Sequence, residues 1–232
     1  LVVGADGMHS AVRAAARLEA RIDSANQVAV VANFLCEHDH QGTAFQWFRG
    51  DGVLAWLPLP DRHVSMVWST EPSHAQALLS FDAAALCEAV AAAGARRLGG
   101  MQLLAPPQEF PLAWLSVRQR VAPRVALIGD AGHVVHPLAG QGVNLGLGDA
   151  RELAAVLAFA SERNEDPGRL SRLRQFERSR AEAILAMQLA TRGLKHLFGS
   201  ESRATAWLRN AGLNLTDRAV VLKQWLARRA ME

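Results

Sequence analysis

Along the first third of the chain, apolar residues recur mainly with the period of β-strands. The apolar run Leu1 to Val3 predicts a short strand, and residues 10–18 predict a short helix after it. Between residues 27 and 69, apolar and polar positions alternate, which is typical of strands with one buried face. We therefore predict an antiparallel meander with strands at residues 28–35, 43–49, 53–58 and 63–69 and turns at residues 50–52 and 60–62.

The rest of the chain contains one more extended region and is otherwise dominated by the helical period. The expected elements are an alanine-rich helix at residues 81–93, extended structure at residues 103–121 broken by Pro106, Pro107 and Pro111, helices on both sides of a break at residues 164–168, and further helices near Glu201 and after Thr216.

This order of elements predicts an α/β (α+β) fold. An antiparallel sheet is inserted between two pieces of a parallel-sheet domain, and helices follow. We expect residues 1–22 and 119–160 to form the parallel-sheet domain, residues 23–118 the inserted domain, and residues 161–232 a C-terminal helical region.

Composition fits a globular domain: half of the 232 residues are hydrophobic and a fifth are charged. Cys36 and Cys87 lie far apart without metal-like spacing, which favours a reducing compartment over a disulfide framework. We recognise no signal peptide and no apolar run long enough to span a bilayer. The expected location is the cytoplasm, with contact to a membrane, if any, from its side.

Basic residues outnumber acidic ones from Arg169 onward. Two interpretations stay open, namely solvated helix faces and attraction to anionic lipid headgroups or an acidic partner. Nucleic-acid binding is not expected, because no recognised nucleic-acid motif accompanies the charge.

The segment from Arg124 to Asp149 carries the clearest chemistry. An apolar run at residues 125–128 predicts a buried strand, and Asp130 follows it, where open α/β sheets bind ligands. Residues 140–144 are then expected to open a helix whose free N–H groups favour a negatively charged ligand atom.

Two motifs resemble signatures of one enzyme family. Residues 129–146, G-D-A-G-H-x-x-H-P-L-A-G-Q-G-x-N-L-G, resemble the second FAD signature of the class A aromatic hydroxylases, the para-hydroxybenzoate hydroxylase-like monooxygenases. Within that family they look most like the ubiquinone-biosynthesis hydroxylases. Residues 4–13, G-A-D-G-x-x-S-x-V-R, resemble the family's Asp-Gly signature. The resemblance implies that the parallel-sheet domain binds FAD and that the inserted sheet belongs to a substrate domain.

The resemblance also implies roles for individual residues around a flavin. Asp130 would anchor the ribityl or pyrophosphate side, and backbone N–H groups at the helix start would stabilise negative charge on the ring. Glycines would let the backbone approach the ring, or would merely permit a tight turn and close packing. No side chain is assigned to catalysis. The expected cofactor-binding residues of this motif are Gly129, Asp130, Pro137, Gly140, Gln141, Gly142, Val143 and Asn144.

In the first motif, Asp6 and Gly7 are expected to order a loop over the FAD phosphates, although Asp6 also suits a cap on the helix near Ser10. Arg13 is either the ionic partner of Asp6 or an ordinary surface arginine.

The implied activity is hydroxylation of an aromatic ring of a ubiquinone precursor, with FAD as cofactor and NAD(P)H and O2 as co-substrates. Possible partners are a membrane surface, at which the enzyme would be peripheral, and a ubiquinone-biosynthesis complex. The alternatives are a class A hydroxylase of a small soluble phenol and a non-catalytic remnant or assembly subunit. A family signature, the phosphate-binding G-x-G-x-x-G, does not precede Leu1. We therefore expect a C-terminal fragment of a longer enzyme that is inactive and colourless by itself.

Other candidate side chains have simpler interpretations. His133 and His136 are not expected to bind a metal, because His-x-x-His alone is a weak signal. A loop-ordering role is favoured for them, and the alternative is that one of them donates a hydrogen bond toward the ring. Trp47, Trp56 and Trp68 could line a site for an aromatic substrate, although a core position is favoured for each.

Overall fold

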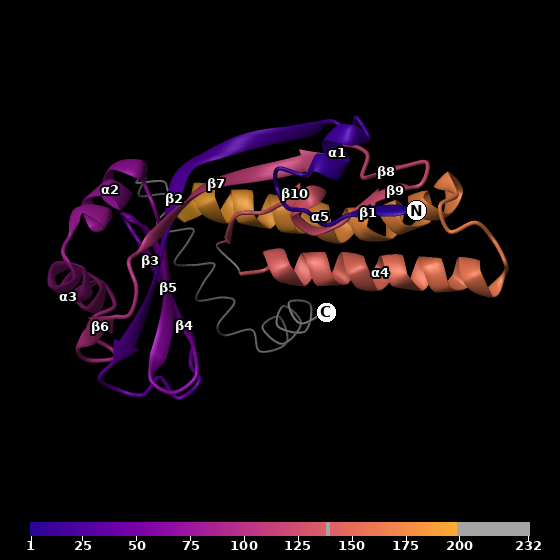
Figure 1. Ribbon diagram of the computed structural model, residues 1–232. Helices are drawn as coiled ribbons and strands as arrows, with labels where there is room; N and C mark the ends of the chain where they lie inside the picture. Colours follow the sequence, from indigo (N-terminus) through magenta and orange to yellow (C-terminus); the bar gives the residue numbers. More distant parts are fainter. Residues whose placement is uncertain (138–139, 199–232) are drawn as a thin grey trace. The chain divides into compact units, whose positions relative to one another are not determined.

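The computed structural model describes residues 1–137 and 140–198, and the chain divides into two compact units. Unit 1 combines residues 1–23 with the chain from residue 113 onward, and unit 2 comprises residues 24–112. The helices expected near Glu201 and after Thr216 lie outside the described residues. The mixed α/β fold predicted from the sequence is confirmed (Figure 1).

A small sheet with a parallel pair of strands organises unit 1. β1 (Val2–Gly4) runs parallel to β9 (Val125–Leu127), with Val3 opposite Ala126, and β8 (Val121–Ala122) pairs antiparallel with the other edge of β9. Two residues of β9 are fully buried, as its apolar sequence predicts. The two sequence segments that make up unit 1 are therefore joined by backbone hydrogen bonds between β1 and β9.

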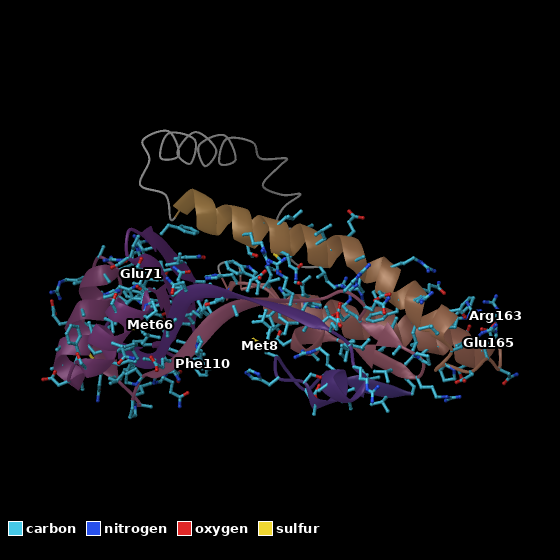
Figure 2. The ribbon with its side chains drawn as sticks, turned by 90° about the horizontal axis from the view of Figure 1, so that it is seen from above. Met8, Met66, Glu71, Phe110, Arg163 and Glu165 are labelled. Carbon is cyan, nitrogen blue, oxygen red and sulfur yellow. The ribbon has the colours of Figure 1, made fainter. Side chains whose placement is uncertain are left out.

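Helices complete unit 1. α1 (Ala11–Ala15) follows β1, a single 3-10 turn η1 (Gly129–Ala131) follows β9, and the long helices α4 (Gly142–Glu162) and α5 (Leu170–Phe198) run beside each other (Figure 1). Leu153 of α4 packs with Leu173 and Phe176 of α5 against Ala126. The turn between α4 and α5 carries Arg163 and Glu165 (Figure 2). This packing holds the start of α4 beside the end of β9.

Unit 2 is built on an antiparallel sheet whose strand order differs from a simple meander. The strands are β2 (Ala20–Cys36), β3 (Phe45–Arg49), β4 (Gly52–Pro58) and β5 (His63–Thr70), and β6 (Met101–Leu103) pairs with β2. The larger sheet has the order β10-β7-β2-β5-β4-β3, in which β10 is His133–Val134 and β7 is Gln108–Val117, so only β3, β4 and β5 form a meander. β5 lies between β2 and β4 and pairs antiparallel with both along its length.

The prolines break the extended region only in part. β7 (Gln108–Val117) continues through Pro111, contrary to the expected break, whereas the chain does leave extended pairing before Gln108. Pro111 is exposed, and β10 (His133–Val134) pairs with β7 at Leu115 and Ser116, so Pro111 interrupts none of these paired positions.

Two helices cover one face of the sheet in unit 2. The sequence predicted α3 (Ala83–Ala93) but not α2 (Pro72–Ser80), which begins with proline at its first position. Their buried side chains pack on Trp56 and Trp68, which are 0% and 2% exposed. No helix among residues 1–137 and 140–198 is both long and apolar enough to cross a membrane.

The close approach of α3 to the sheet makes a glycine necessary. A Cβ atom added to Gly94 would lie 2.1 Å from Cη2 of Trp56, whereas one added to Gly50 would meet no atom within 4 Å. We expect Gly94→Ala to lower the free energy of unfolding by about 1–3 kcal/mol through overpacking. Gly50→Ala, the control, should stay within about 0.5 kcal/mol. Urea denaturation measures both, and equal effects would contradict this packing.

Candidate functional site

The parallel pairing of β1 and β9 brings the two sequence motifs together. The carboxyl ends of parallel strands meet at one edge of a sheet, so the loop with Asp6 and the turn with Asp130 emerge side by side. The backbone N–H of Ile128 donates to the carbonyl of Gly4 at 2.9 Å, which continues the pairing to this edge. This edge of unit 1 is the candidate site.

Asp6 caps the N-terminus of α1. Its carboxylate accepts hydrogen bonds from the Ser10 hydroxyl at 2.6 Å and from the amides of Ala11 and Val12 at 2.7 and 3.1 Å. The Ser10 hydrogen bond, followed by those from backbone amides, lowers the pKa of Asp6 below its ordinary value. The capping interpretation is confirmed, and the role of Asp6 toward FAD phosphates stays a prediction.

Arg13 joins the two motifs instead of pairing with Asp6. Its Nη1 donates to the carbonyl of Ala131 at 2.9 Å and its Nη2 to that of Met8 at 2.7 Å. Of the two alternatives for Arg13, the ion pair with Asp6 is wrong, because the Asp6 carboxylate is engaged by Ser10 and the amides of α1, and the ordinary surface arginine is wrong as well, because both Nη atoms bind backbone carbonyls. Gly7, which follows Asp6 in the same loop, adopts φ +82°, a conformation that favours glycine. The guanidinium thereby fixes the first loop to η1.

Asp130 presents an exposed carboxylate at the end of β9. Among residues 1–137 and 140–198, its side chain makes no hydrogen bond and no ion pair. Gly129 before it adopts φ +56°, which favours glycine over other residues. The carboxylate is therefore available to hydroxyl groups of a ligand at the sheet edge.

The start of α4 offers backbone N–H groups. The helix begins at Gly142 after Gln141, which makes no capping hydrogen bond with its side chain, and its first turn holds no acidic residue. The amide of Leu145 is the one that donates to the carbonyl of Gln141, so the amides of Gly142 and Val143 precede the helical ladder. The side chain of Asn144 donates to that of Gln141 at 3.0 Å. These amides favour an anionic group.

The glycines of this segment have different structural reasons. Gly140 adopts φ +62°, and its amide donates to the carbonyl of Pro137 at 3.0 Å. The turn that this hydrogen bond closes therefore favours glycine at position 140. A Cβ on Gly146 would approach Cα of Gly129 to 3.3 Å, so packing favours glycine there. A Cβ on Gly142 would meet nothing within 4 Å, and its φ is not positive. Neither the turn nor packing against described residues requires glycine at 142.

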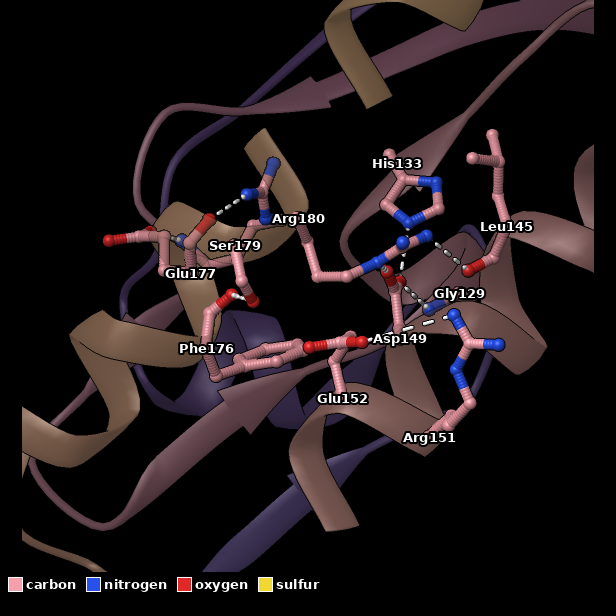
Figure 3. A network of polar contacts seen from close by, with 11 residues as sticks. Gly129, His133, Leu145, Asp149, Arg151, Glu152, Phe176, Glu177, Ser179 and Arg180 are labelled. Atoms are coloured by element: carbon pink, nitrogen blue, oxygen red, sulfur yellow. Dashed lines mark hydrogen bonds and ion pairs between the residues drawn. The ribbon is translucent and has the colours of Figure 1, made fainter. Parts of the chain in front are cut away.

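A buried carboxylate lies directly behind this edge (Figure 3). Asp149 of α4 is 1% exposed and accepts hydrogen bonds from the amide of Gly129 at 3.0 Å and from Nε of Arg180 at 2.8 Å. Nε2 of His133 lies 2.5 Å from the same oxygen that accepts from Gly129. Nη2 of Arg180 also donates to the carbonyl of Leu145 at 3.1 Å. One carboxylate thus joins η1, β10, α4 and α5.

Burial by itself raises the pKa of the Asp149 carboxyl, but the hydrogen bonds from His133, Arg180 and the Gly129 amide outweigh this effect. The pKa of Asp149 is therefore lowered, and the carboxylate is ionised at neutral pH.

Sequence reasoning did not assign Asp149 or Arg180 to the site. The available signal was spacing: Leu145, Asp149 and Leu153 recur every fourth residue and share one helix face, so Asp149 interrupts an apolar stripe. An acid on a buried helix face requires a partner. The identity of that partner, 31 residues away, is not readable from local pattern.

The histidines and tryptophans have structural roles. The contact of His133 with Asp149 agrees with a loop-ordering role, and the buried His136 ring lies 5.5 Å from that of Trp114. The expected substrate-lining role of Trp56 and Trp68 is wrong, because α2 and α3 cover both side chains and leave no surface for a ligand. Trp47 is half-buried, and its role stays a prediction.

Comparison with known proteins identifies the family. The family model of the FAD binding domain matches residues 1–189. This chain belongs to that family. The FAD-binding domain therefore includes both motifs and the carboxylate behind them, together with most of α5.

Relatives and solved structures agree with this assignment. This chain is 36% identical over 97% of its length to ubiquinone biosynthesis monooxygenase COQ6, mitochondrial, of Homo sapiens, and it covers 55% of that protein. It is 35% identical over 97% of its length to 3-demethoxyubiquinol 3-hydroxylase of Escherichia coli (strain K12), and covers 57% of it. The chain thus spans about half the length of these relatives. The crystal structure of p-nitrophenol 4-monooxygenase PnpA from Pseudomonas putida DLL-E4 shares the fold, with a TM-score of 0.76, 16% identity and coverage of 99% of this chain and 58% of that one.

The residues at the candidate site fit FAD. The exposed Asp130 carboxylate suits the hydroxyls of the cofactor, and the amides of Gly142 and Val143 suit its electron-rich atoms. The open space beside Gly142 leaves room for a group that a side chain would displace.

Replacing Asp149 with Asn should destabilise the fold at neutral pH and matter less in acid. Because the folded-state pKa is lowered, the carboxylate contributes its full stabilisation above the unfolded-state pKa of about 4, and this is lost as the pH falls through the lower folded-state value. We expect a loss of about 3 kcal/mol at neutral pH, as for a broken buried ion pair. Urea denaturation across this pH range tests it, and a difference that does not shrink in acid would contradict it.

Proposed function

We propose that the protein containing this chain is an FAD-dependent monooxygenase that hydroxylates an aromatic ring of a ubiquinone precursor, with NAD(P)H and O2 as co-substrates. The observation that carries the proposal is the joint position, at one sheet edge, of the exposed Asp130 carboxylate and the first amides of α4, where the Gln141 side chain makes no capping hydrogen bond. The names of the relatives at 35–36% identity support the substrate class.

In this proposal each group has one task. Asp130 accepts hydrogen bonds from hydroxyls on the ribityl or pyrophosphate side of FAD. The amides of Gly142 and Val143 stabilise negative charge at the edge of the ring system, aided by the dipole of α4. When bound and reduced by NAD(P)H, FAD would supply the reaction with O2 that hydroxylates the aromatic ring of the substrate. The chain holds this cofactor in place and excludes water.

The identity to ubiquinone-biosynthesis enzymes favours a polyprenylated phenol or quinone precursor over a small soluble phenol. We infer that such a substrate is reached from the side of a membrane. In support, the exposed residues of α5 include Arg174 and Arg178 followed by Leu185 and Leu189, which are 57% and 60% exposed. Basic and apolar residues on one helix are typical of interfacial binding.

Substituting leucine for Gly142 should change the affinity for FAD without lowering the free energy of unfolding. Gly142→Leu replaces a poor helix former in open space, so the free energy of unfolding should stay unchanged or rise by up to about 1 kcal/mol. The side chain would occupy the space assigned to FAD and should weaken FAD binding about tenfold or more. Ala150→Leu, at an exposed position of the same helix, is the control. Wild-type FAD affinity in Gly142→Leu, measured by flavin fluorescence, would refute the assigned ring position.

The activity is tested in a bacterial strain that lacks its ubiquinone-ring hydroxylase. The complete gene that encodes this chain should restore ubiquinone and remove the accumulated prenylated phenol, measured by mass spectrometry of lipid extracts. Asp130→Ala should fail because FAD is retained poorly, whereas Glu162→Ala, which removes another exposed carboxylate of unit 1, should succeed. Hydroxylation of soluble phenols by the purified protein without restoration in the strain would favour the alternative substrate class.

A further inference from the structure

Asp149 connects the elements that present the cofactor-binding groups, although it is itself buried. Gly129, whose amide it accepts, immediately precedes Asp130, and Leu145, whose carbonyl accepts from Arg180, lies in the first turn of α4. Asp149, and Arg180 that is bound to it, thus contact the backbone on both sides of the candidate flavin site.

The local sequence around Asp149 fits this arrangement. A Cβ on Gly148 would lie 2.7 Å from Nη2 of Arg180, so glycine there leaves room for the guanidinium. Gly146 and Gly129 approach each other closely enough that a Cβ on Gly146 would be 3.3 Å from Cα of Gly129. Two glycines of α4 therefore allow η1 and α5 to approach the helix where Asp149 binds them.

The chemistry of the position favours a carboxylate over its amide. Both oxygens of Asp149 accept, one from Arg180 and the other from Gly129, and the second also contacts Nε2 of His133. An asparagine supplies a single acceptor oxygen, and its NH2 group would face an N–H donor. Asn at this position must therefore release either Gly129 or Arg180.

We propose that Asp149 is the positioning residue of the flavin site, holding Gly129 in its left-handed conformation and the start of α4 in fixed register with Asp130. It is buried and acts through its contacts with Gly129, Arg180 and His133. This inference rests on the proposed function, because it assigns the network to FAD binding rather than to stability alone.

The test uses the complete protein and compares Asp149→Asn with Glu165→Gln. The control breaks an ion pair in the same unit, in which the Glu165 carboxylate accepts from Arg172 of α5 at 2.6 and 2.7 Å, outside the network around Asp149. Three quantities are measured: the Kd for FAD, the visible circular dichroism of bound FAD, and the Tm without FAD.

We expect Asp149→Asn to raise the Kd for FAD about tenfold to a hundredfold, as for the loss of one hydrogen bond to a charged group. The circular dichroism of bound FAD should also change, because the ring is held differently. Glu165→Gln should leave the Kd and the spectrum unchanged. An unchanged Kd in Asp149→Asn with a lowered Tm would overturn the positioning role, as would equal losses of affinity in both variants.

Two outcomes separate this inference from the function it rests on. If the unmodified protein binds no FAD, the proposed function fails and the inference fails with it. If it binds FAD and Asp149→Asn binds equally well, only the inference fails. Should Asp149→Asn not fold, His133→Ala and His133→Gln decide: weaker FAD binding in the first and recovery in the second, whose amide donates to Asp149, supports the role. Wild-type affinity in both overturns it.

Discussion

The parallel pairing of β1 with β9 is the constraint on which the site depends. It joins strands separated by more than a hundred residues and places the ends of both at one edge. The loop that contains Asp6 and the turn with Asp130 become neighbours only through this pairing, and Arg13 then connects the first loop to Ala131 of η1. Each of the two motifs, residues 4–13 and residues 129–146, is a weak indication of a binding site by itself, and their position at the same sheet edge strengthens that indication.

Behind that edge, α4 serves several purposes within two turns. Its first residues offer amides to an anionic group, Gly146 admits the close approach of η1, and Asp149 fixes η1 and α5 with a buried charge. Buried charges are costly unless fully hydrogen-bonded, and here both carboxylate oxygens have donors. The two carboxylates therefore differ: within the described part of the chain the exposed Asp130 side chain has no hydrogen-bond partner, whereas the buried Asp149 binds Arg180 and stabilises the fold.

The features predictable from sequence were those with local causes. The strand at Val125 followed from an uninterrupted apolar run, and the start of α4 near Gly142 followed from glycine spacing and the apolar face behind it. The central place of β5 was not predictable, because it depends on how well its buried residues match those of β2 and β4. The partners of Asp149 and Arg13 were missed for the same reason, since both are set by contacts between distant elements.

The discontinuity of unit 1 affects the order in which the protein assembles. Residues 24–112 are contiguous and are synthesised before β9, whereas unit 1 needs both of its segments. Folding of unit 2 first would shorten the effective loop that must close when β1 finds β9, and so reduce the entropic cost of that late step. In this order the edge formed by β1 and β9 assembles after unit 2, and until β9 has been made the apolar β1 strand has no partner.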